Sequence, residues 1–481
     1  ADRCKCRWSI LDPPRAHCIA DLPGVLTLGV QSDDLSMDFK ATSEQATPAS
    51  LLRELPILLL TAAGFLLTVV VIYPGYMTND AGFVYQMARE WRFGDWQSPL
   101  MSILWRLVDP IAPGTGSIFL LIASSYWLAF GLLALTVARR SRWLGLTVPL
   151  LALMPPAFML LSMIWRDVLF GIVWLLAAAA VYAIAGRPSP LRRPVQALAL
   201  VLVALGILLR PNAILAAPLL AGYVLWPEGF AWKRAAIVFI PLALAGYAIL
   251  HLAYYIVLDV ERQNPLHSLL VFDLGGITHF TGQNQFPVTW SADETTLLTT
   301  RCHDPSLWDA YWTREPCRFV MQRLERKDDK VFGRPRLVEA WTRAVLAHPL
   351  AYLQHRATHL WTFLTGPHLT LELYPGKIPL ADNPRFQALL ALHAALKPTV
   401  LFRSGFWLLL AGAVCAAAWC RRMTPSGAFA IGTCGSAVVY VLTFFVTGVA
   451  SDFRYAYWCV LAALAGAIAA MVARREPSAG R

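Results

Sequence analysis

The sequence predicts an all-α polytopic membrane protein with about ten transmembrane helices, an interfacial helix in the first outer loop and a mostly helical extracytoplasmic domain. Composition is the first observation: of 481 residues, 57% are hydrophobic and 15% charged, with a mean hydropathy of +0.52. Soluble chains carry about 25% charged residues. The second is the recurrence of apolar windows long enough to cross a bilayer, and the third is the spacing of basic clusters between them.

The ten windows are read against roughly 20 residues per crossing. They lie at 54–73, 117–137, 143–161, 165–186, 194–209, 211–226, 235–257, 404–419, 427–448 and 455–473. Every second window is followed by basic residues, which are Arg139, Arg140 and Arg142, then Arg187, Arg192 and Arg193, Lys233 and Arg234, Arg421 and Arg422, and Arg474 and Arg475. The positive-inside rule then places both termini in the cytoplasm and residues 74–116, 162–165, the turn about Arg210, 258–403 and 449–454 outside.

The net charge of +11 has a simple explanation in such a chain. It reflects cytoplasmic arginines together with binding of anionic lipid or phosphate. No nucleic-acid partner is expected.

This topology divides the chain into four parts. Residues 1–50 form a cytoplasmic segment without periodicity, 51–257 a transmembrane region with the first outer loop, 258–403 an extracytoplasmic domain, and 404–481 the last spans and a short tail. The first 50 residues lack the apolar core of a signal peptide. Residues 1–36 are either disordered or precede a translation start at Met37, and the spacing of their three cysteines matches no standard zinc pattern.

Two cysteines lie in the long outer segment, where oxidation is possible. Cys302 and Cys317 either form a disulfide or are two buried thiols. Cys415, Cys420, Cys434 and Cys459 lie in or beside spans and are expected to be packing residues.

The outer segment also contains signals for helices. Asn264-Pro265 and His348-Pro349 are typical helix starts. The stretch "FDLGGI" at 272–277 is interpreted as helix with packed glycines rather than as a phosphate loop, because no strand precedes it. In "HRATH", His355 and His359 share one helical face at zinc-like spacing but lack the glutamate of a metalloprotease, so packed histidines are favoured over a metal site.

Six ionisable residues are expected at the outer ends of the spans. Such groups are costly at this depth unless they pair or serve a site, and they are Asp80, Arg166, Asp167, Arg210, Asp452 and Arg454. The arginines, taken singly, are explained equally well by contact with lipid phosphates or by pairing with Asp167 and Asp452. Together, the six favour an outward-facing site for a lipid-linked phosphate, which needs fixed guanidinium donors.

The first outer loop opens with an amphipathic stretch, Tyr76 to Pro99. After Thr78-Asn79-Asp80, the apolar side chains recur at helical spacing while polar ones face away, which predicts a helix lying in the membrane interface. The apolar set is Phe83, Val84, Met87 and Trp91, and the opposite set is Tyr85, Arg89 and Arg92. Asp80 is then either a plain N-cap or a group at the mouth of the bundle. Glu90 and Asp95 are interpreted as scaffold.

The order of these features resembles a known family. An acid in the first outer loop, an interfacial helix, a "GDWQSP" turn, arginines at outer span ends and a late "DFRY" are together similar to the GT-C polyprenyl-phosphate-dependent glycosyltransferases. That superfamily includes protein mannosyltransferases and the aminoarabinose transferases of lipid A. The resemblance covers the layout from about 54 to 473, through short and degenerate motifs.

The resemblance implies an inverting transfer of a sugar from a polyprenyl-phosphate donor to a glycan, lipid or protein acceptor outside the cytoplasm. It implies a bacterial inner (cytoplasmic) membrane with the site on the periplasmic side, and membrane lipid as a further partner. Asp80 matches the general base and Asp167 the second acid. Arg166, Arg210 and Arg454 match donor phosphate ligands, with Asn79, Tyr85, Gln97 and Asp452 in supporting or substrate contacts.

This chain also departs from the family pattern. Many members carry a paired acid in the first loop, whereas here Asn79 precedes Asp80. No cofactor is therefore certain, and a divalent metal stays open. Glu90 or Asp95 would replace the second acid only if the fold returned them to the site.

Two other functions fit part of the pattern. A transporter or flippase of a lipid-linked or anionic solute would explain the outer arginines, although transporters usually bind near mid-membrane and often show two similar halves. A non-catalytic assembly factor for envelope polysaccharide is the second. The polar groups of this chain collect at one face, and the large outer segment interrupts any two-fold pattern, which disfavours transport. The outer arginines alone do not distinguish the assembly factor from an enzyme.

Overall fold

The protein is described by a computed structural model that covers residues 48–326, 330–369 and 383–477. Across these residues the regular elements are all helical, with three isolated β-bridges and no strand. The predictions for residues 1–47, including the Met37 start and the three cysteines, lie outside the described residues. The all-α class is confirmed for the described chain.

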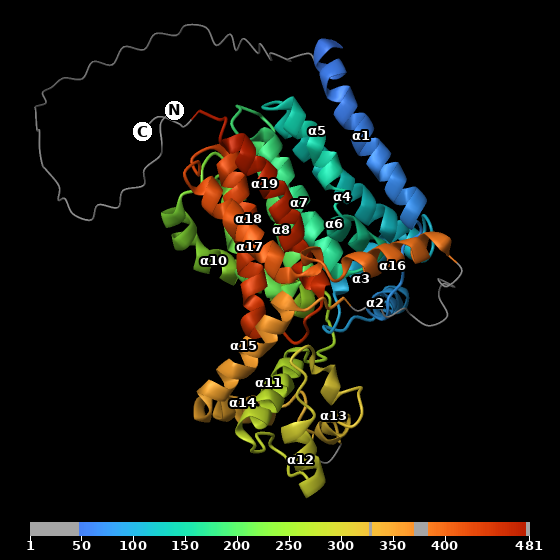
Figure 1. The fold of residues 1–481 in the computed structure, drawn as a ribbon, viewed down its shortest axis with the longest axis vertical. Helices are drawn as coiled ribbons and strands as arrows, with labels where there is room; N and C mark the ends of the chain where they lie inside the picture. Colours follow the sequence, from blue (N-terminus) through green and yellow to red (C-terminus); the bar gives the residue numbers. More distant parts are fainter. Residues whose placement is uncertain (1–47, 327–329, 370–382, 478–481) are drawn as a thin grey trace, which may run out of the picture. The chain divides into compact units, whose positions relative to one another are not determined.

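The helices fall into three sets (Figure 1). The bundle contains α1 (Pro48–Ile72), α4 (Thr115–Ala138), α5 (Arg142–Leu151), α6 (Pro155–Met159), α7 (Arg166–Ile184), α8 (Arg192–Leu209), α9 (Ala217–Leu225), α10 (Trp232–His251), α16 (Pro384–Leu396), α17 (Ser404–Trp419), α18 (Pro425–Thr447) and α19 (Tyr457–Ala473). The first loop holds α2 (Asn79–Glu90) and α3 (Pro99–Val108). The α11–α15 region, residues 266–365, holds α11 (Leu266–Thr281), α12 (Ala292–Thr300), α13 (Phe319–Leu324), α14 (Pro335–Ala347) and α15 (Pro349–Thr365).

Among the described residues, seven helices are long and apolar enough to cross a membrane, or eight if the bent pair Arg142–Leu151 and Pro155–Ser162 is one span. This indicates a membrane protein. The other two predicted windows hold shorter helices: η2 (Pro211–Leu215) followed by α9, and the 16-residue α17. Every predicted window is thus helical, and a total of ten crossings stays a prediction.

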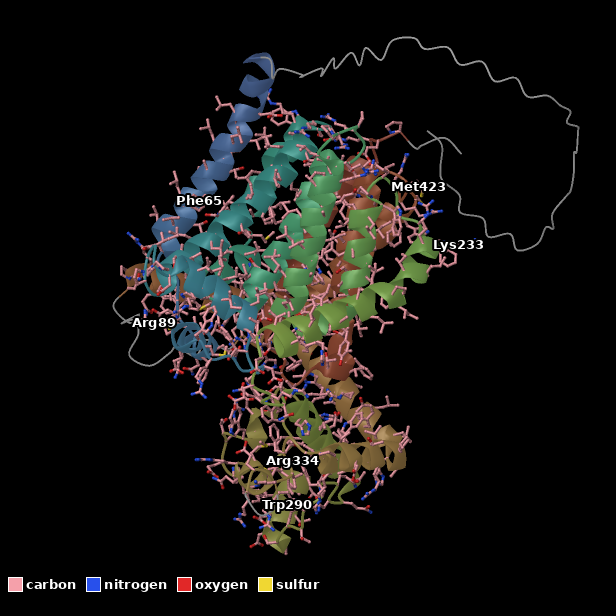
Figure 2. All side chains as sticks on the ribbon, turned by 180° about the vertical axis from the view of Figure 1, so that it is seen from behind. Phe65, Arg89, Lys233, Trp290, Arg334 and Met423 are labelled. Atoms are coloured by element: carbon pink, nitrogen blue, oxygen red, sulfur yellow. A yellow bond between two sulfur atoms is a disulfide. The ribbon has the colours of Figure 1, made fainter. Side chains whose placement is uncertain are left out.

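The basic clusters that follow alternate windows meet at one end of the bundle. Arg140 pairs with Glu476 at 2.5 Å, and Arg475 donates to Ser141 at 2.8 Å. Arg421 donates to the carbonyl of Glu476. In Figure 2, Lys233 and Met423 lie toward this end of residues 48–477, and Trp290 and Arg334 lie at the opposite end, in the α11–α15 region. The alternation of the sequence is therefore reproduced as two chemically different ends of one bundle.

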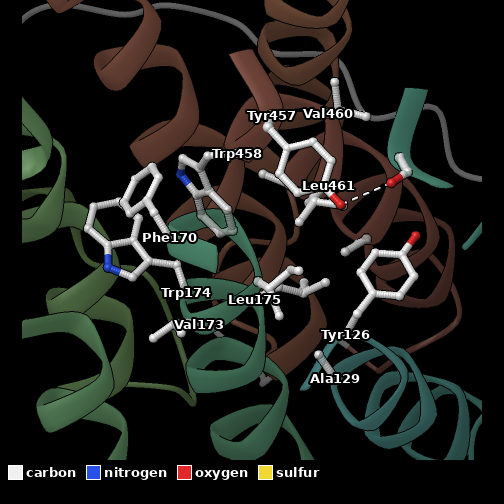
Figure 3. Close-up of a cluster of buried hydrophobic side chains, with 14 of the residues drawn as sticks. Tyr126, Ala129, Phe170, Val173, Trp174, Leu175, Tyr457, Trp458, Val460 and Leu461 are labelled. Carbon is white, nitrogen blue, oxygen red and sulfur yellow. Dashed lines mark hydrogen bonds between the residues drawn. The ribbon is translucent and has the colours of Figure 1, made fainter. Parts of the chain in front are cut away.

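The bundle core is formed by α7 and α19, the two most deeply buried candidate spans. Figure 3 shows their aromatic side chains packed together, with the rings of Trp174 and Trp458 5.5 Å apart and edge to face. The hydroxyl of Tyr457 donates to the carbonyl of Ala157 at 2.9 Å, which ties α19 to α6. Such aromatic pairs add about 0.5–1.5 kcal/mol beyond area burial, and they hold together α7, which begins with Arg166 and Asp167, and α19, which follows Arg454.

The predicted apolar face of the loop helix is only partly right. Val84 is buried in α2, together with Ala81 and Ala88, but Phe83 is 56% exposed. Trp91, also exposed, ends the helix in the left-handed conformation with φ 54°. The small side chains face the protein because α3 packs closely there, which leaves the large ones on the open side. An exposed Phe and Trp are the kind of side chains an interfacial helix presents to a membrane surface.

The α11–α15 region has a hydrophobic core of its own. It contains the disulfide between Cys302 and Cys317. Two backbone hydrogen bonds join it to the loop that precedes α19: the amide of Trp308 donates to Val449 O at 2.9 Å and that of Ser451 to Ser306 O at 2.8 Å. The region therefore packs directly on the chain segment that leads to Arg454.

Candidate functional site

The six ionisable residues singled out in the sequence lie together at the α11–α15 end of the bundle. They come from α2, from the start of α7, from the C-cap of α8 and from the turn before α19, η7 (Phe453–Ala456). Three are carboxylates and three are guanidinium groups, so their formal charges cancel. The contacts below show how the fold pairs them.

Asp80 is not the N-cap of its helix. Thr78 caps α2, with its hydroxyl accepting from the amide of Ala81 at 3.3 Å and from the indole of Trp165 at 2.8 Å. The Asp80 carboxylate is therefore free to point at the cluster, where it contacts Arg454 at 2.6 Å and accepts from the Gln97 amide at 3.2 Å. The side chain remains 40% exposed. Of the two interpretations of Asp80, a plain N-cap or a group at the mouth of the bundle, these contacts agree with the second.

The chain before α2 is fixed by pairing with the chain before α7. The amide of Tyr76 donates to Ser162 O at 2.8 Å, and Ile164 donates back to Tyr76 O at 3.2 Å. These bonds set the spacing between Asp80 and the start of α7, although more than eighty residues separate them in sequence.

Arg454 is held from three sides. The Asp452 carboxylate accepts from its backbone amide at 3.0 Å and lies 3.6 Å from its Nε. Its guanidinium also lies over the Trp165 ring, 4.7 Å from the centroid. A cation placed on an aromatic face gains further attraction when it is desolvated, so the group is positioned before any ligand arrives.

Arg210 and Asp167 form the buried half of the cluster. Their side chains are 2.5 Å apart and 8% and 4% exposed. Arg210 also lies over the ring of Tyr455 at 4.7 Å. Asp167 stands in the first turn of α7, where the helix dipole favours a carboxylate. Asp167 therefore neutralises Arg210 rather than facing open space.

Arg166 joins the cluster to the "GDWQSP" turn. Its guanidinium donates to the carbonyl of Trp96 at 3.1 Å. Gln97, the next residue, is the one that donates to Asp80. The turn is therefore positioned from both sides of the site.

The charges around Asp80 keep it ionised. Burial by itself would raise the pKa of this carboxyl, but the nearby guanidinium groups of Arg454 and Arg166 outweigh that effect and hold the pKa below its ordinary value. Two guanidinium nitrogens of the cluster, Nε of Arg210 and Nε of Arg454, are buried and make no hydrogen bond within the described residues, although Nε of Arg454 lies 3.6 Å from the Asp452 carboxylate. The cluster thus combines an ionised, partly exposed carboxylate with guanidinium groups whose hydrogen-bonding capacity is not fully used.

Several residues predicted for the site lie elsewhere or act as support. The ring of Tyr85 packs on Trp105 with centroids 5.0 Å apart and does not face the ion cluster. Asn79 is the first residue of α2. Asp95 accepts from Tyr255 at 2.9 Å and from the amide of Gln263 at 2.7 Å, and Glu90 accepts from Gln86 at 2.8 Å. Glu90 and Asp95 therefore do not supply a second acid beside Asp80.

No group of three or more His, Cys, Asp or Glu side chains arranged to hold a metal occurs in the described part of the chain. His355 and His359 are both fully buried, and His359 bonds the carbonyl of Pro305 at 2.8 Å. His355 lies 3.4 Å from Asp273 and 3.0 Å from His303. The packed-histidine interpretation of "HRATH" agrees with this arrangement.

Sequence reasoning missed the aromatic support of the site and a second ion pair. Trp165, Trp96 and Tyr455 contact the arginines, but nothing in their local patterns distinguishes them from ordinary interface aromatics. The second pair joins Asp273 to Arg356 at 2.5 Å with both side chains fully buried. The signal for it was a lone Asp inside the apolar run "LLVFDLGGI".

The comparisons with known proteins give no relative: no family model, no curated protein and no solved structure matches this chain.

Proposed function

We propose that the protein is an integral membrane glycosyltransferase of the GT-C type, which transfers a sugar from a polyprenyl-phosphate donor to an extracytoplasmic acceptor with inversion. The observation that carries the proposal is the Asp80–Arg454 contact at 2.6 Å, an accessible carboxylate placed against a fixed guanidinium at the end of the bundle away from the basic clusters. Glycosyl transfer from a phosphate needs such a base beside an anion site.

The reaction follows from these two groups. An acceptor hydroxyl attacks the anomeric carbon from the face opposite the phosphate, forming the new C–O bond as the bond to the phosphate oxygen breaks. The hydroxyl proton passes to the Asp80 carboxylate, and the electron pair of the broken bond leaves with the polyprenyl phosphate. Arg454 and Arg210 stabilise the charge on that leaving group through donors that are already in place.

The ion pair gives the base a dependence on the donor. With no donor bound, Arg454 lies on Asp80 and lowers its pKa. A phosphate at Nε of Arg454 competes with Asp80 for the same guanidinium, so the carboxylate loses part of its counter-charge and its pKa rises. Asp80 then becomes a stronger base when the donor is present.

The sidedness of the proposal has separate support. Basic residues collect at the far end of the bundle, and the positive-inside rule makes that end cytoplasmic. The α11–α15 region carries a disulfide, a bond that persists in oxidising compartments. Both observations favour cytoplasmic termini and a site facing outward, and the proposal adds ten crossings and the periplasmic face of a bacterial inner membrane.

The test is sugar transfer from a radiolabelled polyprenyl-phosphate sugar in proteoliposomes containing acceptor from the host envelope. Asp80→Asn is expected to lower turnover by about 10²–10⁴-fold, the usual contribution of a positioned acid or base. Glu90→Gln is the matched control, because it neutralises an exposed carboxylate on the same helix. Near-wild-type turnover in Asp80→Asn would refute the assignment of the base, and flipping of the donor without transfer would favour the flippase alternative.

A further inference from the structure

A polar pocket lies in the α11–α15 region, away from the ion cluster. Its volume is about 350 Å³, and its lining residues are Trp312, Thr313, Arg318, Met321, Gln322 and Glu325. Met321 is 2% exposed and belongs to the core of the region, so the floor is rigid. Cys317, which lies between Trp312 and Arg318 in sequence, is fixed by its disulfide to Cys302.

One wall of the pocket is the partly exposed indole ring of Trp312, which packs on two other indole rings. Trp312 is 42% exposed although it is packed on Trp308 and Trp96, with ring centroids 5.5 and 5.6 Å away. Trp308 itself is 5% exposed. An aromatic plane that is fixed from behind and open in front loses little conformational entropy when a flat partner stacks on it.

The rest of the wall is polar and available. The side chains of Arg318, Gln322 and Glu325 are exposed and make no hydrogen bond or ion pair within the described residues. They supply guanidinium, amide and carboxylate groups, which together donate and accept hydrogen bonds. A sugar ring has an apolar C–H face and a rim of hydroxyls that both donate and accept, so one aromatic plane beside planar polar groups matches its chemistry.

The aromatic cluster connects this pocket to the candidate base. Trp96 belongs to the "GDWQSP" turn, its carbonyl accepts from Arg166, and the following Gln97 donates to Asp80. Trp96 therefore contacts Trp312 through its ring and contacts the ion cluster through its carbonyl, and the next residue, Gln97, bonds to Asp80. The pocket and the candidate base are thus linked through one turn of the chain.

We propose that the pocket at Trp312 is a carbohydrate subsite that binds the acceptor, and that the acceptor is therefore an oligosaccharide or a glycan-bearing molecule. The sugar already in the acceptor stacks on Trp312 while the receiving hydroxyl extends toward Asp80. The role as acceptor subsite rests on the proposed function, whereas carbohydrate binding at Trp312 does not.

The binding test uses the full-length protein in detergent with linear hexasaccharides of glucose, mannose and N-acetylglucosamine as probes, followed by tryptophan fluorescence and saturation-transfer NMR. At least one probe is expected to bind the wild type, with about tenfold weaker binding in Trp312→Ala and partial recovery in Trp312→Phe. Trp361→Ala is the matched control, since Trp361 is 69% exposed but outside the pocket. No binding by the wild type, or equal loss in Trp361→Ala, overturns the proposal.

The kinetic test separates this inference from the proposed function. In the transfer assay Trp312→Ala is expected to raise KM for the acceptor about tenfold and to leave KM for the polyprenyl-phosphate donor unchanged. A change confined to the donor KM would assign the pocket to the donor sugar and overturn the acceptor role. If Asp80→Asn keeps full transfer while Trp312→Ala still weakens hexasaccharide binding, the proposed mechanism fails and carbohydrate binding stands.

Discussion

Two carboxylate–guanidinium pairs of the same chemistry occupy opposite environments. Asp80 and Arg454 lie 2.6 Å apart with side chains 40% and 15% exposed, whereas Asp273 and Arg356 lie 2.5 Å apart with both at 0%. The first pair is at the end of the bundle, beside guanidinium nitrogens that make no hydrogen bond among the described residues. The second is enclosed between α11 and α15, where Arg356 also donates to the carbonyl of Gly448.

The difference shows how burial decides what an ion pair does. An exposed pair can exchange its partner for a ligand at little cost, because water solvates the group that is released. A fully buried pair cannot separate without leaving a charge in a medium of low polarity. We therefore interpret Asp80–Arg454 as a working pair and Asp273–Arg356 as a structural one, which fixes the α11–α15 region against the segment that leads to Arg454.

The largest effect is expected from breaking the buried pair. Asp273→Ala leaves Arg356 charged and uncompensated, and should lower the free energy of unfolding by about 3–5 kcal/mol. Asp80→Ala should cost only about 1 kcal/mol or less, because Asp80 is 40% exposed and Arg454 keeps the Asp452 carboxylate 3.6 Å from its Nε. Denaturant unfolding in detergent, with hydrogen exchange of residues 266–365 as the local readout, measures both. Equal losses in the free energy of unfolding for the two variants would contradict the division into a working pair and a structural pair.

The disulfide is the next largest expected contribution to the same region. Cys302 and Cys317 close a loop with a sequence separation of 15, and a loop of that length corresponds to about 3 kcal/mol of stabilisation. The double serine variant should therefore unfold earlier in the α11–α15 region, while the bundle is unaffected. Reduction of the wild type should reproduce the shift, and the double variant should not respond to reductant.

Acid is expected to lower the stability of the α11–α15 region, which contains the Asp273–Arg356 pair, before it affects the bundle. Burial, together with neighbouring His355 and His279, lowers the pKa of His303 to about 3, and burial lowers that of His359 to about 4. Their unfolded values are about 6.5, so the unfolded chain binds more protons below that pH and stability is lost as pH falls from about 6.5 toward 4.

Asp273 adds to this acid sensitivity at lower pH. Burial would raise the pKa of Asp273, but His355 and Arg356 hold it below its ordinary value, so its contribution is present above about pH 4 and lost below it. Unfolding of residues 266–365 followed from pH 7.5 to 4 should show a falling midpoint, and His303→Gln should flatten the profile. A midpoint independent of pH would contradict neutral, buried histidines.

The smallest effect is expected at a surface pair of the α11–α15 region. Arg314 and Asp304 are 3.3 Å apart, with side chains 58% and 33% exposed. Arg314→Ala should change the free energy of unfolding by about 0–1 kcal/mol, since both groups are solvated before and after. This variant calibrates the comparison: a large loss there would mean that exposure does not set the strength of ion pairs in this region.

Much of the fold could be predicted from local sequence. Composition and apolar windows identified a helical membrane protein. Two prolines marked helix starts, and in the structure Pro265 is the N-cap of α11 and Pro349 the first residue of α15. The apolar face of α2 was partly wrong: Ala81 and Ala88 are buried and Phe83 is exposed, and the sequence could not show that α3 bonds the carbonyls of Val84 and Ala88. Hydrophobic periodicity gives a face, and only a neighbour decides which part of it is buried.

The sequence by itself determined the helical class, the apolar windows, the opposite chemical character of the two ends and the types of group at the candidate site. The tertiary structure alone decided the pairings: Arg454 with Asp80, Arg210 with Asp167, and Arg356 with Asp273. The physical reason is the distance along the chain over which each interaction acts. Turns, caps and periodicity act over a few residues, whereas an ion pair depends on distance and burial between groups that the chain brings together only when the bundle packs.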